Sequence, residues 1–201
     1  MPRIRAILIQ TVFLLASCAH RQGKIISKVN DVFHVIFNKE QLANLPERRL
    51  DSALSPFIPQ FLDDAKKRGV IIPQETVDML RQLIYVDQLS TAPEPGVMAV
   101  CTRYYADEYT YAGPQEVKWM NIEVQRAQSL FYTEGNPKRL QELIYHELFH
   151  CFLNKGHLPL GVPGIMGSSL SKGSDRIFVD WNGLVDEMFS PKYLQMIPNA
   201  S

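Results

Sequence analysis

The most regular pattern of apolar positions in the chain lies just after Asn136 and Pro137. Four apolar residues recur there at three- and four-residue intervals: Leu140, Leu143, Ile144 and Leu148. This spacing places them on one face of an α-helix. Asn136 is a favourable N-cap and Pro137 suits the first helical position, so a helix is expected to begin there with one face towards a core.

The chain before this helix contains shorter apolar runs that are typical of strands. Three segments rich in strand-forming residues are expected to pair in a sheet: residues 83–86, 97–105 and 117–124. Helical spacing occurs at residues 57–65 and stops at Gly69, and a short helix is expected from about Pro73. Strands followed by a long amphipathic helix predict an α+β fold in which a small mixed sheet backs that helix.

Three further segments have patterns of their own. Residues 24–37 are apolar enough to be ordered, and their spacing suits one face of a helix, although a strand is also possible. The run of charged residues at 63–68 is interpreted as the solvated face of its helix. Asp180 is expected to cap a last helix over residues 181–188.

The overall composition is that of an ordinary globular protein. The 201 residues are enough for one domain with a buried core, and 46% of them are hydrophobic. The 21 basic residues balance the 21 acidic ones, so the formal net charge is zero. A surface without a basic surplus does not attract nucleic acid, and no nucleic-acid partner is expected.

The first 17 residues resemble a bacterial lipoprotein signal peptide. Arg3 and Arg5 precede an apolar run at residues 6–16, which is too short to be a permanent membrane span. The run ends in Leu-Ala-Ser-Cys, similar to the lipobox after which the cysteine becomes lipidated. We therefore expect an exported protein that is anchored to a membrane of the bacterial cell envelope through Cys18. An ordinary signal peptide with a coincidental cysteine is the alternative.

Without residues 1–17, the chain is interpreted as a tether at residues 18–50 and a domain at residues 51–201. The two cysteines of that domain, Cys101 and Cys151, form an even pair in an oxidising compartment, so they are a possible disulfide. Two unrelated buried thiols are the alternative.

The candidate chemistry is concentrated on the predicted helix. His146 and His150 are four residues apart, so their imidazoles lie on one helix face about one turn apart. Two neutral ring nitrogens presented in this way can bind one zinc ion, and Glu147 beside them can act on a water molecule at the metal. His157 is available as a third ligand, because residues 154–156 contain an Asn and a Gly that favour a chain reversal.

A tight apolar turn with Met166 at its centre follows at residues 163–167. The order of H-E-x-x-H, a glycine-assisted turn, a third His and a methionine turn resembles the metzincin-type zinc peptidases. More narrowly, H-E-L-F-H-C-F-L-N-K-G-H followed by G-I-M is similar to a group of bacterial lipoprotein metallopeptidases. The motif likeness covers residues 146–167, and a weaker likeness in element order extends over residues 55–191. The chain departs from the family pattern at Leu153, which stands where the family has glycine, and its third His is displaced by one residue.

This resemblance implies one Zn²⁺ per chain, held by His146, His150 and His157 above Met166, with Glu147 as the general base. The implied reaction is hydrolysis of a peptide bond in a peptide or protein substrate. The implied fold has the motif helix against the sheet and a short C-terminal subdomain that contains the methionine turn and the final helix. Four tyrosines near the expected cleft strand are candidates for stabilising the oxyanion: Tyr104, Tyr105, Tyr109 and Tyr111.

Two alternatives remain open from the sequence. In the first, the third ligand is not His157 but an acid of the last predicted helix, Asp186 or Glu187, as in another class of zinc peptidases. A lipid-anchored binding protein that keeps the zinc fold without turnover is the other alternative, although such a protein has no use for Glu147. Cys151 is not favoured as a ligand, because it lies about 100° around the helix from the second His. His34 is interpreted as a structural histidine.

Overall fold

The computed structural model describes residues 24–29, 32–37, 45–91, 96–106, 117–167, 170 and 175–199. The predicted signal peptide, the lipidation site at Cys18 and the tyrosines at 109 and 111 lie outside these residues. None of the helices in the described part of the chain combines the length and the apolar character needed to cross a membrane.

A six-stranded sheet forms one layer of the molecule. Its strands, in spatial order, are β1 (Lys24–Val29), β2 (Val32–Phe37), β5 (Ala99–Ala106), β6 (Val117–Gln125), β4 (Leu80–Val86) and β3 (Arg49–Leu50). The pairs β1–β2 and β5–β6 are antiparallel, whereas β2–β5, β4–β6 and β3–β4 are parallel. The sheet is therefore mixed, and the predicted α+β fold class is confirmed.

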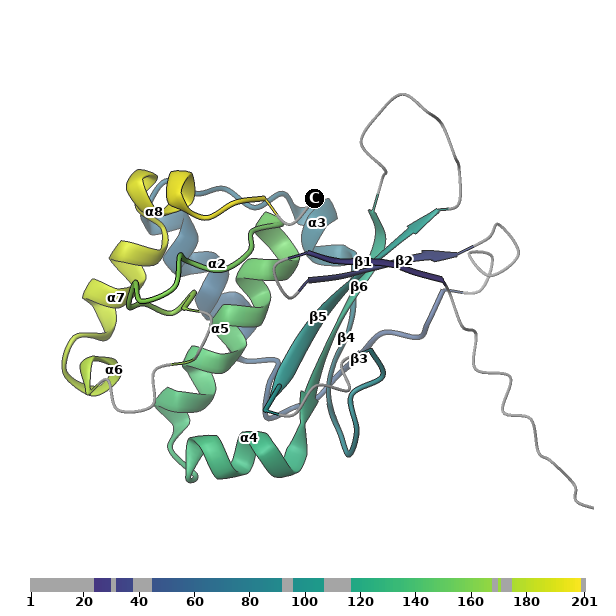
Figure 1. The fold of residues 1–201 in the computed structure, drawn as a ribbon, viewed down its shortest axis with the longest axis horizontal. Helices are drawn as coiled ribbons and strands as arrows, with labels where there is room; N and C mark the ends of the chain where they lie inside the picture. Colours follow the sequence, from purple (N-terminus) through teal and green to yellow (C-terminus); the bar gives the residue numbers. More distant parts are fainter. Residues whose placement is uncertain are drawn as a thin grey trace, which may run out of the picture.

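The helices gather on one face of this sheet (Figure 1). They are α2 (Phe57–Lys67), α3 (Gln74–Asp78), α4 (Arg126–Thr133), α5 (Pro137–Leu153), α6 (Arg176–Val179), α7 (Trp181–Met188) and α8 (Pro191–Met196). Helix α5 lies between the sheet and the layer formed by α2, α7 and α8 (Figure 1). One continuous apolar core joins α5 to β4, β5 and β6 on one side and to α2 and α7 on the other.

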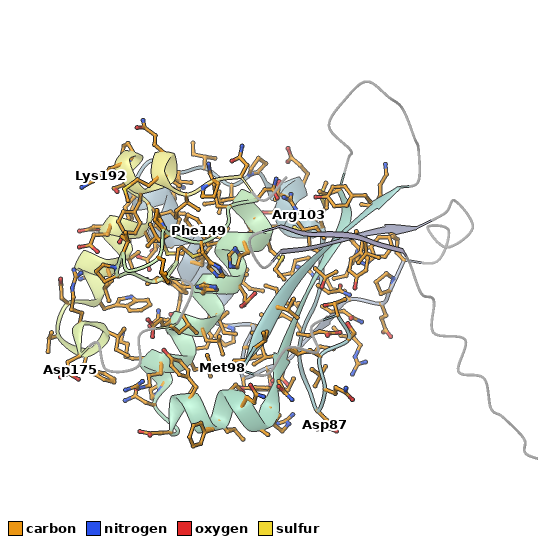
Figure 2. All side chains as sticks on the ribbon, viewed as in Figure 1. Asp87, Met98, Arg103, Phe149, Asp175 and Lys192 are labelled. Carbon is orange, nitrogen blue, oxygen red and sulfur yellow. A yellow bond between two sulfur atoms is a disulfide. The ribbon has the colours of Figure 1, made fainter. Side chains whose placement is uncertain are left out.

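The position of α5 explains why its burial differs from the predicted single apolar face. Every residue of this helix from Gln141 to Phe152 is buried, because the sheet covers one side and helices cover the other. Phe61 of α2 contacts the ring of Tyr145 edge-on, with 5.3 Å between the centroids. Phe149 extends from α5 towards α7, where it approaches the ring of Phe189 at 6.0 Å (Figure 2).

Part of the segment before residue 51, which the sequence analysis interprets as a tether, packs on the domain. Strands β1, β2 and β3 come from this segment and belong to the sheet. A short apolar run fits a helix and a strand almost equally well. For residues 32–37 the parallel pairing with β5 decides between the two.

Helix α4 is an element that the sequence pattern did not predict. Its buried residues are Ser129, Tyr132 and Thr133, whereas Leu130 and Phe131 are 55% and 78% exposed. Leu130 and Phe131 therefore point outwards, and the usual periodic signal of an amphipathic helix is missing. The three predicted strands and the last helix, by contrast, are present as β4, β5, β6 and α7.

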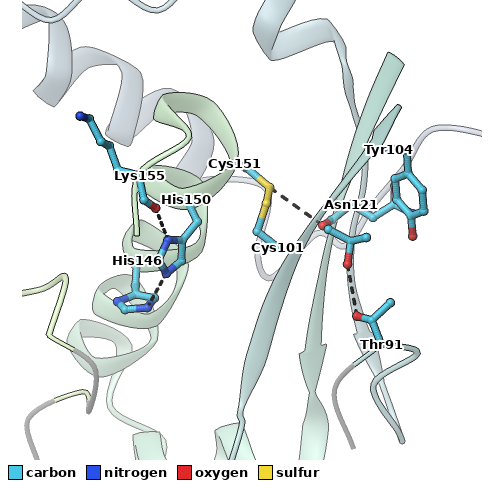
Figure 3. The surroundings of a disulfide bond; sticks show 9 residues. Thr91, Cys101, Tyr104, Asn121, His146, His150, Cys151 and Lys155 are labelled. Carbon is cyan, nitrogen blue, oxygen red and sulfur yellow. Dashed lines mark hydrogen bonds between the residues drawn. A yellow bond between two sulfur atoms is a disulfide. The ribbon is translucent and has the colours of Figure 1, made fainter. Parts of the chain in front are cut away.

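A disulfide between Cys101 and Cys151 joins the sheet to α5. The two residues are 50 positions apart in the sequence, and their Cα atoms are 5.7 Å apart. The bond connects the first half of β5 to the residue directly after His150 in α5 (Figure 3).

We expect the double variant Cys101→Ala/Cys151→Ala to lose about 3–4 kcal/mol of unfolding free energy, because the closed loop restricts the unfolded chain. Urea denaturation of the oxidised wild type and the variant measures this difference. The wild type in reductant, which loses the bond without a substitution, is the control. A double variant as stable as the wild type would contradict the expected contribution, as would free labelling of both thiols in non-reduced protein.

Candidate metal centre

Local sequence defines both ends of α5. The Asn136 side chain accepts a hydrogen bond from the backbone N–H of Lys138 at 2.9 Å, and Pro137 occupies the first turn. At the other end, Asn154 adopts the left-handed conformation with φ 52° and ψ 42°. Asn tolerates this conformation better than most residues, so the helix ends there and the chain reverses direction to run back beside α5.

The turn brings His157 beside the two histidines of α5. The Nε2 atoms of His146 and His150 are 2.9 Å apart. The Nε2 atom of His157 lies 2.9 Å from that of His146 and 3.2 Å from that of His150. His146 and His150 are buried and His157 is partly exposed, so the cluster is open to its surroundings on the side of the third histidine.

Backbone carbonyls orient the two histidines of α5. Nδ1 of His146 lies 2.7 Å from the carbonyl oxygen of Ile165, and Nδ1 of His150 lies 2.5 Å from that of Lys155 (Figure 3). A carbonyl oxygen can only accept, so both Nδ1 atoms carry the proton and donate. In the neutral rings the Nε2 atoms are then left with lone pairs that point at one another.

This arrangement fits a bound metal ion. Three imidazole nitrogens in a tetrahedral zinc site, each 2.0–2.1 Å from the metal, are ~3.3 Å apart. The separations of 2.9, 2.9 and 3.2 Å are slightly shorter than this. A metal ion between these nitrogens would accept their lone pairs, and N–H donation to carbonyls is the usual outer support of a metal-binding histidine. The three histidines are therefore close enough to bind one metal ion.

The methionine turn contacts this cluster through its backbone. Met166 is fully buried in the core, and its carbonyl oxygen accepts a hydrogen bond from the N–H of Leu158 at 2.8 Å. Gly164 has a φ of 149°, and its carbonyl accepts from the N–H of Gly167 at 3.0 Å, which closes the turn. The turn therefore contributes the Ile165 carbonyl to His146 and a backbone hydrogen bond to the residue after His157.

Glu147 is 4% exposed and lies beside the histidine cluster on α5. It precedes Cys151 by four residues, so it lies one turn away on nearly the same helix face. Cys151 is bonded to β5, which places Glu147 between the sheet-facing side of α5 and the side that presents the histidines.

The two acids considered as alternative ligands have other partners. Glu187 accepts from Arg176 through both carboxylate oxygens, at 2.8 and 3.1 Å. Asp186 pairs with Arg68 at 2.6 Å. Among the residues that the structure describes, the group of side chains able to share a metal ion consists of the three histidines alone.

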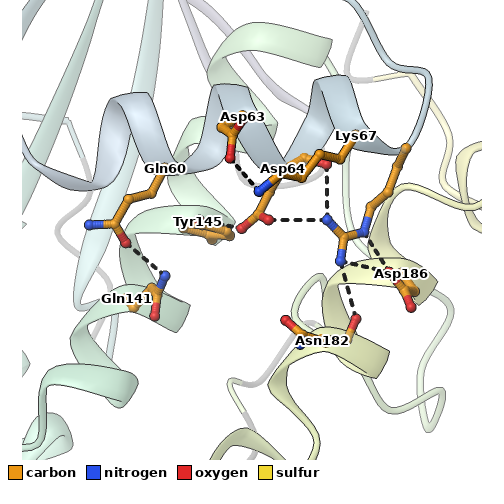
Figure 4. Close-up of polar contacts among 9 residues, drawn as sticks. Gln60, Asp63, Asp64, Lys67, Gln141, Tyr145, Asn182 and Asp186 are labelled. Atoms are coloured by element: carbon orange, nitrogen blue, oxygen red, sulfur yellow. Dashed lines mark hydrogen bonds and ion pairs between the residues drawn. The ribbon is translucent and has the colours of Figure 1, made fainter.

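The charged run at residues 63–68 is not simply a solvated face. Lys67 and Asp63 do form an exposed pair, but the side chains of Asp64 and Arg68 are only 22% and 17% exposed. Asp64 accepts from the hydroxyl of Tyr145 at 2.8 Å (Figure 4). Arg68 also reaches Asp186, so the run connects α2 to both α5 and α7. The solvated face that we expected for this run therefore holds for Asp63 and Lys67 and not for Asp64 and Arg68, because periodicity does not show which charges face a neighbouring helix.

Tyr104 is not placed to stabilise an oxyanion at the histidine cluster. Its ring stacks on Trp119 with 4.6 Å between centroids, on the opposite side of the sheet from Cys101 and α5 (Figure 3). Side chains alternate along a strand, so a residue three positions from Cys101 points to the other face. Burial raises the pKa of Tyr104 to about 12. Tyr105 is buried in the same strand.

Glu142, one turn before His146, is 1% exposed and accepts a hydrogen bond from Tyr132 at 2.6 Å. Burial raises the pKa of the Glu142 carboxyl. The folded state therefore favours the neutral acid, and this contribution to stability is present below the unfolded pKa of about 4.3 and is lost as pH rises through the folded pKa.

Glu142→Gln stays neutral at every pH. We expect the variant to have a larger unfolding free energy than the wild type at about pH 7 and to lose this advantage at about pH 4. Urea unfolding of the metal-free proteins at both pH values tests this. Equal stability near neutrality, or a difference that does not change with pH, would show that the carboxylate is accommodated without cost.

Comparison with protein-family models, curated proteins and solved structures finds no match to this chain. The class of site therefore follows from geometry alone: three histidines, two of them on one helix, arranged to hold a metal ion.

Proposed function

We propose that this protein is a zinc-dependent metallopeptidase that binds one Zn²⁺ per chain and hydrolyses peptide bonds. The observation that carries the proposal is the convergence of three Nε2 atoms within 3.2 Å, with two of the rings oriented by backbone carbonyls. The H-E-x-x-H pattern and the methionine turn, which resemble those of metzincins, support the choice of zinc and of peptide hydrolysis.

Zinc bound by three neutral imidazoles supplies Lewis-acid chemistry, because it lowers the pKa of a water molecule and polarises a carbonyl group. His146, His150 and His157 would hold the ion, and as neutral ligands they would leave its charge uncompensated. Glu147 takes a proton from the attacking water and passes it to the amine that leaves. Its burial at 4% exposure limits competition from bulk water for this carboxylate.

A metal analysis combined with a peptide-library digest tests the proposal. The protein is expected to contain one zinc per chain, to cleave peptides, to lose cleavage after chelation and to regain it when zinc is restored. Stoichiometric zinc without cleavage of any peptide in a broad library would favour the lipid-anchored binding protein instead. Absence of zinc binding would refute both functions.

We further propose that the chain is exported and lipid-anchored to the bacterial cell envelope through Cys18. The support is the apolar run at residues 6–16 followed by Leu-Ala-Ser-Cys, together with a disulfide that suits an oxidising compartment. Mass spectrometry of the mature N-terminal peptide is expected to find an acylated Cys18, and Cys18→Ala is expected to leave an unprocessed chain. An unmodified N-terminus at another residue would refute the anchor.

A further inference from the structure

The residues that follow α8 run beside the turn that carries the third histidine. Residues 197–199 lie antiparallel to this turn through a bridge between Lys155 and Asn199. The N–H of Gly156 donates to the carbonyl of Pro198 at 2.9 Å, and Nζ of Lys155 donates to the carbonyl of Ile197 at 3.3 Å. Ile197 is 1% exposed, so the core anchors the segment from which these carbonyls project.

These contacts lie next to two of the three histidines. Lys155 supplies the carbonyl that accepts from Nδ1 of His150, and Gly156 directly precedes His157. Residues 197–199 therefore hold the turn on the side before His157, while the Leu158–Met166 hydrogen bond holds it on the side after. Leu153, which stands where the metzincin pattern has a glycine, still belongs to α5, so the turn begins only after it.

Helix α8 also contacts the turn whose backbone orients His146. The hydroxyl of Tyr193 donates to the carbonyl oxygen of Pro163. The Tyr193 ring lies so close to Gly164 that a Cβ added there would come within 2.6 Å of the hydroxyl oxygen. The next residue is Ile165, whose carbonyl accepts from Nδ1 of His146. Tyr193 thus fixes the turn that orients this ring.

We propose that Tyr193 and residues 197–199 are positioning elements of the metal centre, which set its affinity by holding the backbone around all three histidines. Partners that orient metal ligands typically change metal affinity by about 10- to 100-fold when they are removed. The inference rests on the proposed metal site, but it concerns residues that do not touch the ion and is independent of peptidase activity.

Two variants and one matched control test it. A chain that ends at Met196 lacks residues 197–199 and their hydrogen bonds to residues 155–156. A chain that ends at Asn199 retains them. Tyr193→Phe keeps the ring against Gly164 but removes the hydroxyl. Zinc affinity is measured by competition with a chromophoric chelator, and urea unfolding of the metal-free proteins reports the fold separately.

We expect the chain ending at Met196 to bind zinc about 10- to 100-fold more weakly, Tyr193→Phe to bind several-fold more weakly, and the chain ending at Asn199 to match the wild type. With Co²⁺ as the probe, the visible spectrum of the chain ending at Met196 (the Met196 variant) should shift towards that of His157→Ala. A merely structural role would lower the urea midpoint without this spectral change.

Wild-type affinity and spectrum in both Tyr193→Phe and the Met196 variant would overturn the inference while leaving the proposed function intact. If the Met196 variant does not fold, wild-type affinity in Tyr193→Phe is enough to overturn it. If the wild type itself binds no zinc, the proposed function fails and the inference fails with it.

Discussion

Glu147→Gln is expected to reduce peptide cleavage by about 10²- to 10⁴-fold while one zinc per chain is retained. The amide has almost the shape of the carboxylate but cannot accept a proton, so the step that activates water is lost. The ligands are unaffected, because Nδ1 of His146 and Nδ1 of His150 remain bonded to backbone carbonyls of Ile165 and Lys155. The expected kinetic result is a fall in kcat larger than any change in KM.

Glu142→Gln is the matched control for this experiment. It makes the same chemical change one turn before His146 on the same helix, at a buried carboxyl whose hydrogen-bond donor is Tyr132. Cleavage should fall in Glu147→Gln and persist in Glu142→Gln. Undiminished cleavage by Glu147→Gln would remove the general base from the mechanism, and loss of zinc from this variant would instead make Glu147 part of the binding site.

Replacement of His146 or His150 by Ala is expected to remove most of the bound zinc. Both side chains project from α5, which is capped at Asn136, buried along its length and bonded to the sheet through Cys151. A rigid helix cannot move another group into the vacated position. His157→Ala should weaken binding less, because this histidine lies on the turn after α5 rather than on the helix and is partly exposed.

Metal content of the purified variants, with His34→Ala as the control histidine, measures this effect. Protons compete with zinc for neutral imidazoles, so bound zinc should also decrease as pH falls. If His157→Ala keeps its full zinc content and Glu187→Ala loses it, the third ligand is Glu187 of α7 and not His157. The Arg176 contacts of Glu187 make the opposite result the expected one.

The helix of the metal centre could be predicted because its signals are local. The cap at Asn136, the four-residue spacing of His146 and His150, and the left-handed stop at Asn154 depend only on neighbouring residues. The predicted strands β4, β5 and β6 were found for the same reason, since alternation and strand propensity are local properties.

The surroundings of the centre could not be predicted in this way. Residues 32–37 form a strand that pairs with β5, residues 24–29 pair in turn with residues 32–37, and Tyr104 faces away from α5 because of its position in that sheet. The hydroxyl of Tyr193 reaches a carbonyl 30 positions away, and Lys155 donates to a carbonyl 42 positions away. Contacts over such separations depend on how whole elements pack. Every residue has a backbone carbonyl, so the sequence does not show which carbonyls accept these hydrogen bonds. Sequence pattern therefore located the three histidines that are close enough to bind a metal ion, and only tertiary packing determined the groups that orient two of them.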